Sequence, residues 1–402
     1  MKAFAKSLVA AVLGWQIRQL RKKNNFKIIA VVGSIGKTST KLAIANVLSA
    51  KYKVQHQEGK YNDLVTVPLV FFGEPTPGLF NPLAWLTVFW RNHQKIKNYP
   101  YDVVVLELGT DGPGQISQFK KYLNVEIAVV TAITPEHMEF FGTLDAVAQE
   151  ELSVSLFSTL LLINKDLCDQ KYLKELSNSL TYSLGSAADF SPVNLNIQAG
   201  TKTKVEQYSM LAAAAVAQKM GFQASEIKQG IAAIKPVAGR MQHLTGVNSS
   251  IIIDDSYNAS PAAVKLALES MYRMDSPQKI AVLGNMNELG ESSEEEHRKI
   301  GEFCDPKQLS LVLTIGPDAN KYLAPAAEAK GCKVITFDNP YTVGDYLKPI
   351  IKKGAIVLVK GSQNRVFAEE SIKAILASPA DKSKLVRQTP SWLKIKEKAF
   401  KK

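Results

Sequence analysis

The chain has 402 residues, enough for two or three domains of ordinary size. Hydrophobic residues make up 46% and charged residues 21%, a soluble globular composition that excludes collagen-like, disordered and polytopic membrane proteins. The net charge of +12 is concentrated at the ends, with +7 in residues 1–27 and +6 in residues 379–402. A nucleic-acid binder more often spreads its charge over a folded face, so we expect solvated ends or contact with anionic lipid, and no nucleic-acid partner.

The three cysteines lie far apart in the sequence, and no two of them form a C-x-x-C pair. A disulfide scaffold or a zinc ribbon needs paired cysteines, so neither is expected. A reducing, cytoplasmic setting fits this cysteine usage best.

Residues 3–17 are apolar but too short and interrupted to span about 30 Å of hydrocarbon. The basic cluster follows the apolar stretch instead of preceding it, which disfavours a signal peptide. Five apolar side chains fall near helical spacing, namely Phe4, Leu8, Val12, Trp15 and Ile17, and Leu13 and Leu20 widen this stripe. We expect a basic amphipathic helix over residues 1–25, lying on the cytoplasmic membrane surface or packed on the body.

A second apolar run covers residues 79–90 and is also shorter than a membrane span. It could extend a membrane-facing patch, but packing in the core or beneath the first helix is the favoured interpretation.

A strand, a glycine-rich turn and a helix follow one another at the start of the body. Residues 26–32 are a β-branched run, residues 33–40 read G-S-I-G-K-T-S-T, and residues 41–48 have helical periodicity. This is the context of a phosphate-binding loop, where glycines let backbone N–H groups approach phosphate and the helix start adds positive charge. The alternative is a tight turn with an incidental lysine. The predicted ATP contacts here are Gly33, Ser34, Gly36, Lys37, Thr38 and Ser39.

Two further strand patterns each lead to a candidate site residue. Residues 102–107 end in Glu107, a carboxylate suited to Mg²⁺ at the carboxyl edge of a sheet, although a surface position on a loop is the alternative. Residues 127–133 precede His137, and a lone histidine is more often structural.

The spacing G-x-x-G-K-T is shorter than the general phosphate-loop pattern and resembles the ATP loop of the Mur ligase superfamily. Five more segments resemble motifs of its MurF branch, in the same order. They are E-L-G-T-D-G-P-G at 107–114, H-M-E-F-F-G-T at 137–143, G-R … D-D-S-Y-N-A-S-P at 239–261, V-L-G-N-M-N-E-L-G-E … H at 282–297 and V-L-V-K-G-S at 357–362.

This resemblance implies an α/β fold, with a P-loop central domain built on a mostly parallel sheet and a smaller Rossmann-like C-terminal domain. It also implies ATP- and Mg²⁺-dependent amide ligation, in which a carboxylate becomes an acyl-phosphate and an amine such as D-Ala-D-Ala attacks it. The implied catalytic residues are Lys37, His137, Glu151 and Arg240. The implied further ATP contacts are Arg240, Asp255 and Asn258. The implied metal ligands are Thr38, Glu107, His137 and Glu151.

Glu151 stands where the family carries a carbamylated lysine that binds a second Mg²⁺. Glutamate has the charge of a carbamate, so it would replace that ligand directly or through water and make the enzyme independent of CO₂. Alternatively, the second metal site is lost. A one-residue slip of the alignment would put Glu150 there instead.

Other departures from the family pattern concern the parts that recognise the nucleotide and the substrate. Family members carry an N-terminal UDP-gripping domain before the ATP loop, for which we expect no room here. Ser209 stands at the position of an asparagine near adenine, within a shortened middle domain, and Gln363 replaces an arginine. In the segment that resembles N-N-x-x-G-V-P-L, Asp63 and Thr66 replace the second Asn and the Gly.

We therefore expect a helix over 1–25, a central domain over 26–238, a C-terminal domain over 239–378 and a basic tail over 379–402. In the C-terminal domain, strands are expected at 251–254, 279–283, 311–315, 333–336 and 355–359. The protein is expected to be a cytoplasmic monomer that contacts the inner face of the membrane peripherally through residues 1–25, or does not contact it.

Three functions remain open. The first is a MurF-like ligase acting on a peptidoglycan precursor, and the second is a ligase for a lipid-linked or polymeric carboxylate. The third is a non-catalytic ATP-binding protein. Glu151→Gln discriminates the third from the two ligases, because a working metal ligand is needed for ATP turnover but not for nucleotide binding.

Overall fold

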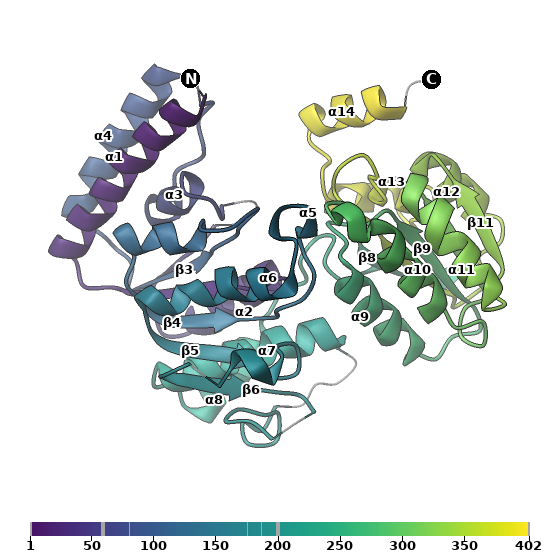
Figure 1. Ribbon diagram of the computed structural model, residues 1–402, viewed down its shortest axis with the longest axis horizontal. Coiled ribbons are helices and arrows are strands. Elements are labelled where there is room, and N and C mark those ends of the chain that lie inside the picture. The colour runs from purple at the N-terminus through teal and green to yellow at the C-terminus, as the bar shows by residue number, and fades with distance from the viewer. Residues whose placement is uncertain are drawn as a thin grey trace. The chain divides into compact units, whose positions relative to one another are not determined.

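The structure is a computed structural model and describes residues 2–57, 61–79, 81–174, 176–185, 187–197 and 202–400. Its contacts divide the chain into two compact units (Figure 1). Unit 1 comprises residues 1–134, 140–202 and 206–235, and unit 2 comprises residues 135–139, 203–205 and 236–402. Each unit is built on one six-stranded sheet.

The sheet of unit 1 is parallel throughout. Its spatial order is β2 (Val54–Gln55), β3 (Val103–Glu107), β1 (Lys27–Val32), β4 (Val125–Val130), β5 (Ser158–Asn164) and β6 (Ser179–Tyr182). Strand β1 lies between β3 and β4, with Ala30 opposite both Leu106 and Ala128. Since parallel strands end at the same edge, the loops that follow these three strands meet there.

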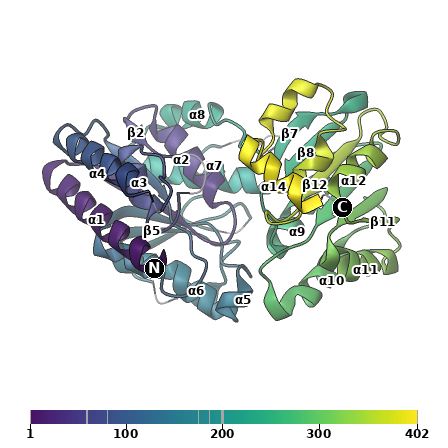
Figure 2. The same ribbon diagram turned by 90° about the horizontal axis from the view of Figure 1, so that it is seen from above.

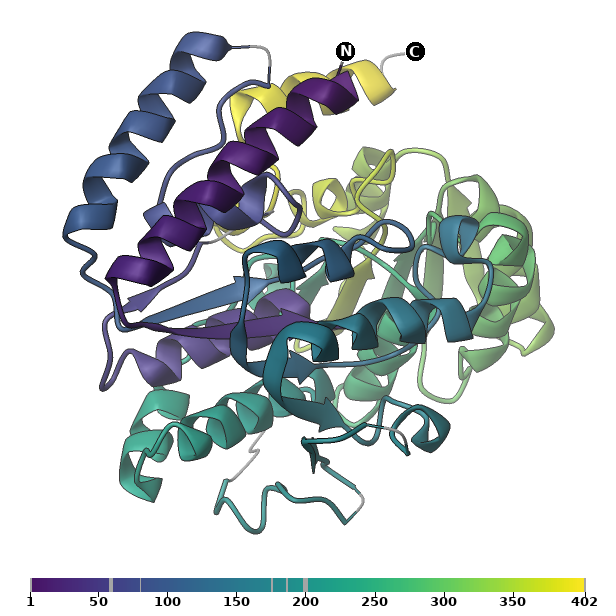
Figure 3. The ribbon, with the colours of Figure 1, turned by 60° about the vertical axis from the view of Figure 1, so that its left-hand side comes forward.

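Helices cover both faces of this sheet, as its run of apolar strands requires. On one face, α2 (Lys37–Leu48), α7 (Lys204–Lys219) and α8 (Ala224–Ala232) contribute to one core cluster with β1, β3, β4 and β5. On the opposite side lie α1 (Lys2–Lys23), α3 (Thr66–Phe72) and α4 (Pro82–Lys97) (Figure 3). The short α5 (Met138–Phe141) and α6 (Leu144–Leu152) follow β4.

Helix α1 packs on the body of unit 1 through a stripe that only partly matches the one that the sequence predicts. The buried side chains are Val9, Leu13, Gln16, Ile17 and Leu20. Leu13, Ile17 and Leu20 belong to the predicted stripe, whereas Leu8 and Trp15 of that stripe are exposed. The side chain of Phe4 lies outside those that the structure describes. The apolar positions of this helix extend almost all round it, so periodicity alone did not fix which face is covered.

Helix α4 contains most of the second apolar run and is buried on one face only. Trp85 and Val88 pack with Val9 and Leu13 of α1, which confirms packing beneath the first helix. Among the described residues, none of the helices combines the length and apolar character needed to cross a bilayer.

The sheet of unit 2 is parallel except for one edge pair, β7 and β8. Its order is β11 (Val334–Phe337), β10 (Leu311–Ile315), β9 (Lys279–Gly284), β12 (Ile356–Lys360), β8 (Ile251–Asp255) and β7 (Gln242–Thr245). One core cluster joins it to α9 (Pro261–Tyr272), α10 (Ser293–Phe303) and α11 (Ala324–Ala329). Another joins it to α12 (Pro340–Leu347) and α13 (Glu369–Ile372). Figure 2 shows α9, α10, α11 and α12 around the strands of this sheet.

The final helix, α14 (Pro390–Phe400), lies within the expected basic tail. Its Lys396 is fully buried and forms ion pairs with Glu369 and Glu370. This part of the tail is therefore built into unit 2 and is not a solvated extension.

Short 3₁₀ and π helices complete the elements: η1 (Ile116–Lys121), η2 (Ser153–Phe157), η3 (Gln170–Tyr172), η4 (Val247–Ser249), η5 (Gly290–Ser292), η6 (Ala319–Leu323, π) and η7 (Pro379–Lys384). The α/β fold class with two mostly parallel sheets is confirmed. The three cysteines are buried free thiols. The expected domain boundaries stay a prediction.

Candidate active site

The loop between β1 and α2 depends on two glycines. Gly33 has φ +117°, and a Cβ there would lie 2.5 Å from Thr131 Oγ1 and 2.8 Å from the Ala132 backbone nitrogen. Gly36 is the N-cap of α2 with φ 79°, and no side chain caps the helix there. Both positions favour glycine because an L side chain is strained at positive φ. The result is a narrow turn that leads to an uncapped helix start.

Several N–H groups of the loop have protein acceptors. Gly33 N–H donates to Glu151 Oε2 at 2.7 Å, and Ser34 N–H donates to the Ala132 carbonyl at 2.9 Å. The first backbone bond within α2 runs from Thr40 N–H to the Gly36 carbonyl. The first N–H groups of a helix have no intrahelical acceptor and form an anion site. We therefore expect the phosphate contacts to come from residues 35–39 rather than from the N–H groups of Gly33 and Ser34.

Helix α2 carries two lysines on its first turns, with different surroundings. Lys37 Nζ donates to the Gly33 carbonyl at the loop. Lys41 is buried, and its Nζ lies 3.2 Å from Glu107 Oε2 at the end of β3. Lys41 therefore compensates the buried Glu107 charge, whereas Lys37 stays with the loop.

Thr38 and Glu107 bring oxygen atoms together beside the loop. Thr38 Oγ1 donates to Glu107 Oε1 at 3.2 Å. Glu107 Oε2 is buried and, among the described residues, has no aligned hydrogen-bond donor, since Lys41 approaches it only as an ion pair. Carboxylate and hydroxyl oxygens are ligands that Mg²⁺ prefers, so these residues fit that ion.

Glu150 and Glu151 are adjacent on α6 but contact different parts of unit 1. Glu150 accepts the N–H groups of Gly114 and Ile116, both at 2.6 Å. Glu151 is 2% exposed, and its Oε2 accepts the Gly33 N–H of the phosphate loop. Successive residues of a helix point about 100° apart, which explains the separation. The geometry thus agrees with the alignment that places Glu151, not Glu150, at the loop.

Two candidate residues of unit 2, Asp255 and Asn258, contact Lys360 at the end of β12. Lys360 Nζ lies 2.6 Å from Asp255 Oδ2 and donates to the Asn258 carbonyl at 2.9 Å. The other oxygen of Asp255 accepts the Met241 N–H at 3.1 Å. Both Asp255 oxygens therefore stabilise the 255–258 turn, and contact of Asp255 with a nucleotide stays a prediction.

Arg240 lies over the ring of Tyr257, with its guanidinium carbon 4.1 Å from the ring centroid. A cation stacked on an aromatic face is attracted to it and has a restricted orientation. Tyr257 therefore helps to orient the predicted phosphate-binding arginine within unit 2.

His137 is grouped with unit 2 and has a left-handed backbone, with φ 52°. Its Nδ1 lies 2.7 Å from Glu288 Oε2, and its Nε2 lies 3.7 Å from Glu136 Oε1. Glu288 also has a positive φ, of 66°. Two non-glycine residues in this sparsely populated region, in contact with each other, are typical of functional sites.

The structure thus distributes the predicted site residues between the two units. Unit 1 brings Lys37, Thr38, Glu107 and Glu151 together around the loop, whereas unit 2 holds His137, Arg240, Asp255 and Asn258. In the described ranges, no three His, Cys, Asp or Glu side chains form a metal-binding group. The ligand set of Thr38, Glu107, His137 and Glu151 therefore stays a prediction.

Sequence reasoning missed three residues that hold the candidate site. Lys41 pairs with Glu107, Lys360 pairs with Asp255, and Glu288 pairs with His137. A charged residue at the end of an otherwise apolar strand, as Lys360 is in β12, was the available indication.

Ser209, considered for adenine, is buried in α7, where its Oγ lies 3.1 Å from Thr40 Oγ1. This hydrogen bond joins α7 to α2 within unit 1. Its observed role is therefore in packing the helices.

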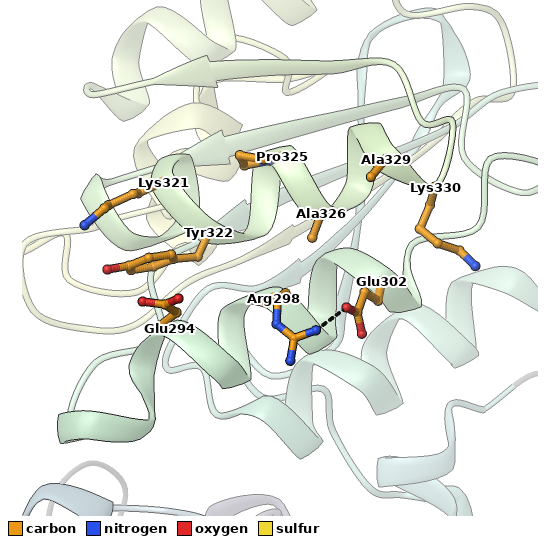
Figure 4. A pocket seen from close by; sticks show the side chains of 9 residues that line it. All are labelled: Glu294, Arg298, Glu302, Lys321, Tyr322, Pro325, Ala326, Ala329 and Lys330. Atoms are coloured by element: carbon orange, nitrogen blue, oxygen red, sulfur yellow. Dashed lines mark hydrogen bonds and ion pairs between the residues drawn. The ribbon is translucent and has the colours of Figure 1, made fainter.

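A groove of about 660 Å³ lies elsewhere in unit 2, between α10 and the η6–α11 segment (Figure 4). Its charged side chains are of both signs, and Arg298 pairs with Glu302 at 2.5 Å across one helical turn. No predicted site residue lines it.

Comparison with known proteins defines the class. Residues 31–221 match the Mur ligase middle domain, and residues 239–363 match the Mur ligase glutamate ligase domain. Together the two matches cover more than three quarters of the chain, in the order that the motifs predict. The chain therefore belongs to the Mur ligase family.

The relatives identify the branch of the family that this chain resembles. The UDP-N-acetylmuramoyl-tripeptide–D-alanyl-D-alanine ligase of Bacillus subtilis is 24% identical over 88% of this chain and 76% of the relative. The enzyme of that name from Escherichia coli is 26% identical over 89% and 78%. MurF from Thermotoga maritima, solved in complex with ADP, superposes with a TM-score of 0.73 at 23% identity, covering 91% and 83%. The chain is MurF-like in sequence and in fold.

Proposed function

We propose that this protein is an ATP-dependent ligase that joins the amine of D-Ala-D-Ala to the terminal carboxylate of a UDP-MurNAc-tripeptide. The observation that carries the proposal is the loop of unit 1, where Lys37, Thr38, Glu107 and Glu151 converge. The relatives named as D-alanyl-D-alanine ligases support the choice of substrates.

The reaction must hold two anions, the substrate carboxylate and the triphosphate of ATP, close together. The carboxylate attacks the γ-phosphorus, giving an acyl-phosphate and ADP, and the amine then displaces phosphate from the acyl carbon. Lys37 and the N–H groups at the start of α2 would neutralise the phosphates. Arg240, oriented by Tyr257, would add positive charge from unit 2.

Thr38 and Glu107 are the residues that would hold Mg²⁺, with Glu151 as the carboxylate at the position of the family's carbamylated lysine. When bound, Mg²⁺ supplies Lewis-acid neutralisation of the phosphate oxygens. His137 and Asn258 keep their predicted roles at the metal and at the nucleotide.

A second candidate is a lipid-linked donor carboxylate instead of the soluble nucleotide precursor. The specific observation in its favour is the exposure of large apolar side chains on α1 and α4 of unit 1. A membrane-associated ligase would meet a lipid-linked substrate at the bilayer surface.

The test is to incubate the purified protein with ATP, Mg²⁺, UDP-MurNAc-tripeptide and D-Ala-D-Ala, and to measure ADP release and product mass together. We expect one added dipeptide per ADP, and a 10²- to 10³-fold slower reaction for Lys37→Ala. ADP release without product would point to another carboxylate, tested next with a lipid-linked donor. Absence of turnover with both donors, with ATP still bound, would contradict the ligase.

A further inference from the structure

Helices α1 and α4 leave an outer face of unit 1 uncovered. Five large apolar side chains of these two helices are exposed: Leu8 (59%) and Trp15 (47%) of α1, and Leu83 (75%), Leu86 (62%) and Trp90 (63%) of α4. Single exposed apolar side chains are ordinary, but several on two adjacent helices indicate an interaction site.

The two helices run in the same direction, side by side (Figure 3). Gln16 donates to the Phe89 carbonyl at 2.8 Å, Asn92 donates to Gln16 Oε1 at 2.9 Å, and Asn24 donates to the Ile96 carbonyl at 3.0 Å. Gln16 and Asn92 are buried, so these bonds fix the register of the pair. The N-terminal halves, which carry the exposed leucines, therefore lie at the same end.

The charge of the pair is of one sign. Neither helix contains an aspartate or a glutamate. Arg91 and Lys95 pair with Glu74 of unit 1. Lys22, Lys23 and Lys97 are exposed near the C-terminal ends and form no ion pair with any residue that the structure describes. The exposed leucines thus lie toward the N-terminal ends of the two helices and these three lysines toward the C-terminal ends, with the two tryptophans between them. Lys6, near the leucine end, pairs with Asp63.

We propose that the outer face of α1 and α4 docks on an anionic lipid bilayer. Stable peripheral binding needs two contributions, apolar insertion and electrostatic attraction, and this face supplies both. Tryptophan prefers the boundary between hydrocarbon and water, where Trp15 and Trp90 would lie. A second copy of the chain is a poorer occupant, because two faces of the same sign repel each other.

This inference does not rest on the ligase reaction, and its test needs no substrate. The full-length protein is sedimented with vesicles of phosphatidylcholine alone, or of phosphatidylcholine mixed with phosphatidylglycerol. We expect binding only to the anionic vesicles, weakened by added salt. Lys22→Gln/Lys23→Gln/Lys97→Gln should weaken partitioning on the order of a hundredfold, at roughly fivefold per basic residue. Leu83→Ser/Leu86→Ser should weaken it about tenfold or more.

Matched controls use the same changes at exposed sites elsewhere. Lys330→Gln/Lys352→Gln/Lys353→Gln removes the same charge from unit 2, and Leu156→Ser/Val193→Ser removes apolar side chains from another part of unit 1. We expect both controls to bind like the unchanged protein. Equal losses in the controls, or no binding to anionic vesicles, would overturn the proposal. So would concentration-dependent dimers that Leu83→Ser/Leu86→Ser abolishes, because this face would then join two copies.

Discussion

Two neighbouring carboxylates, Glu150 and Glu151, can be separated by substitution. Glu151→Gln keeps an acceptor for the Gly33 N–H but removes the negative charge at the loop. If Glu151 replaces the anionic metal ligand of the family, this change should lower the ligation rate on the order of 10²-fold and leave nucleotide binding intact. The measurement is turnover against Mg²⁺ concentration, together with binding of a fluorescent ATP analogue.

The matched control is Glu150→Gln, one position earlier. Glu150 accepts two N–H groups of the 114–116 turn, so its loss should lower the melting temperature and leave turnover per folded molecule nearly unchanged. If Glu151→Gln turned over normally at every Mg²⁺ concentration, Glu151 would not be a metal ligand.

Asp254 is fully buried, and burial raises the pKa of its carboxyl to about 6, with Glu369 and Asp255 adding to the rise. Ser256 donates to Oδ1, whereas Oδ2 has no hydrogen-bond partner among the described residues. The carboxyl of Asp254 therefore binds a proton more tightly in the folded protein than in the unfolded chain, where an aspartate has a pKa of about 3.9. The stabilisation is complete below about pH 4 and is lost as the pH rises to about 6.

Asp254→Asn keeps an oxygen that accepts the hydrogen bonds from Ser256 and removes the carboxyl group that titrates. Between pH 4 and pH 6, the free energy of unfolding of the unchanged protein should fall relative to the variant by about 2 kcal/mol. Urea unfolding at several pH values measures this difference, with the exposed Asp275→Asn as the control. If the free energy of unfolding changed with pH in the same way for the unchanged protein and for Asp254→Asn, Asp254 would be ionised in both the folded and the unfolded protein.

At the scale of elements, the strands were the most predictable part of the chain. Continuous β-branched runs such as residues 26–32 and 311–315 became β1 and β10, because buried parallel strands are apolar on both faces. The phosphate loop was equally predictable, since its glycines and lysine are needed at fixed spacing. The covered face of α1 was only partly predictable, because it depends on α4, a helix about 70 residues later in the chain.

The partners in the buried ion pairs were also beyond prediction from sequence. Lysine is ordinarily a surface residue. Burial of Lys41, Lys360 and Lys396 depends in each case on a carboxylate that is far away in the sequence and lies opposite the lysine in the fold. The excess of positive charge in the C-terminal segment therefore suggested a solvated tail. In the structure, part of that charge is neutralised inside unit 2 by Glu369 and Glu370.

Helix α14 is attached through this buried network. Lys396 Nζ lies 2.8 Å from Glu369 Oε1 and 2.5 Å from Glu370 Oε1. Arg387 pairs with Glu369 and also donates to the carbonyls of Ser256 and Tyr257, at 2.7 and 2.9 Å. The segment before α14 thus supports the turn that carries the predicted nucleotide-binding residues.

Lys396→Met should destabilise the protein by about 3 kcal/mol or more, because two buried carboxylates lose a shared partner. The control Lys394→Met changes an exposed lysine of the same helix and should stay within about 0.5 kcal/mol. Urea unfolding measures both. Equal stabilities of the two variants would show that water, not Lys396, compensates these carboxylates in solution.

At the scale of the whole molecule, the two units have separate hydrophobic cores. The cluster of unit 1 packs α2, α7 and α8 on its sheet, and the two clusters of unit 2 lie on opposite faces of the second sheet. Neither sheet shares a strand with the other. The phosphate loop and the Arg240–Asn258 segment therefore lie in units that each have their own hydrophobic core.

Because its sheet is covered on both faces by its own helices, unit 2 should fold alone. We expect a fragment of residues 236–402 to unfold in one cooperative thermal transition, with the helix and strand content of the intact unit. A second fragment, 236–388, lacks α14 and leaves Glu369 and Glu370 without Lys396, so it should melt at a clearly lower temperature. Circular dichroism and hydrogen exchange measure both. A broad, non-cooperative melt of the longer fragment would mean that unit 2 depends on residues 135–139 and 203–205, or on unit 1, for its fold.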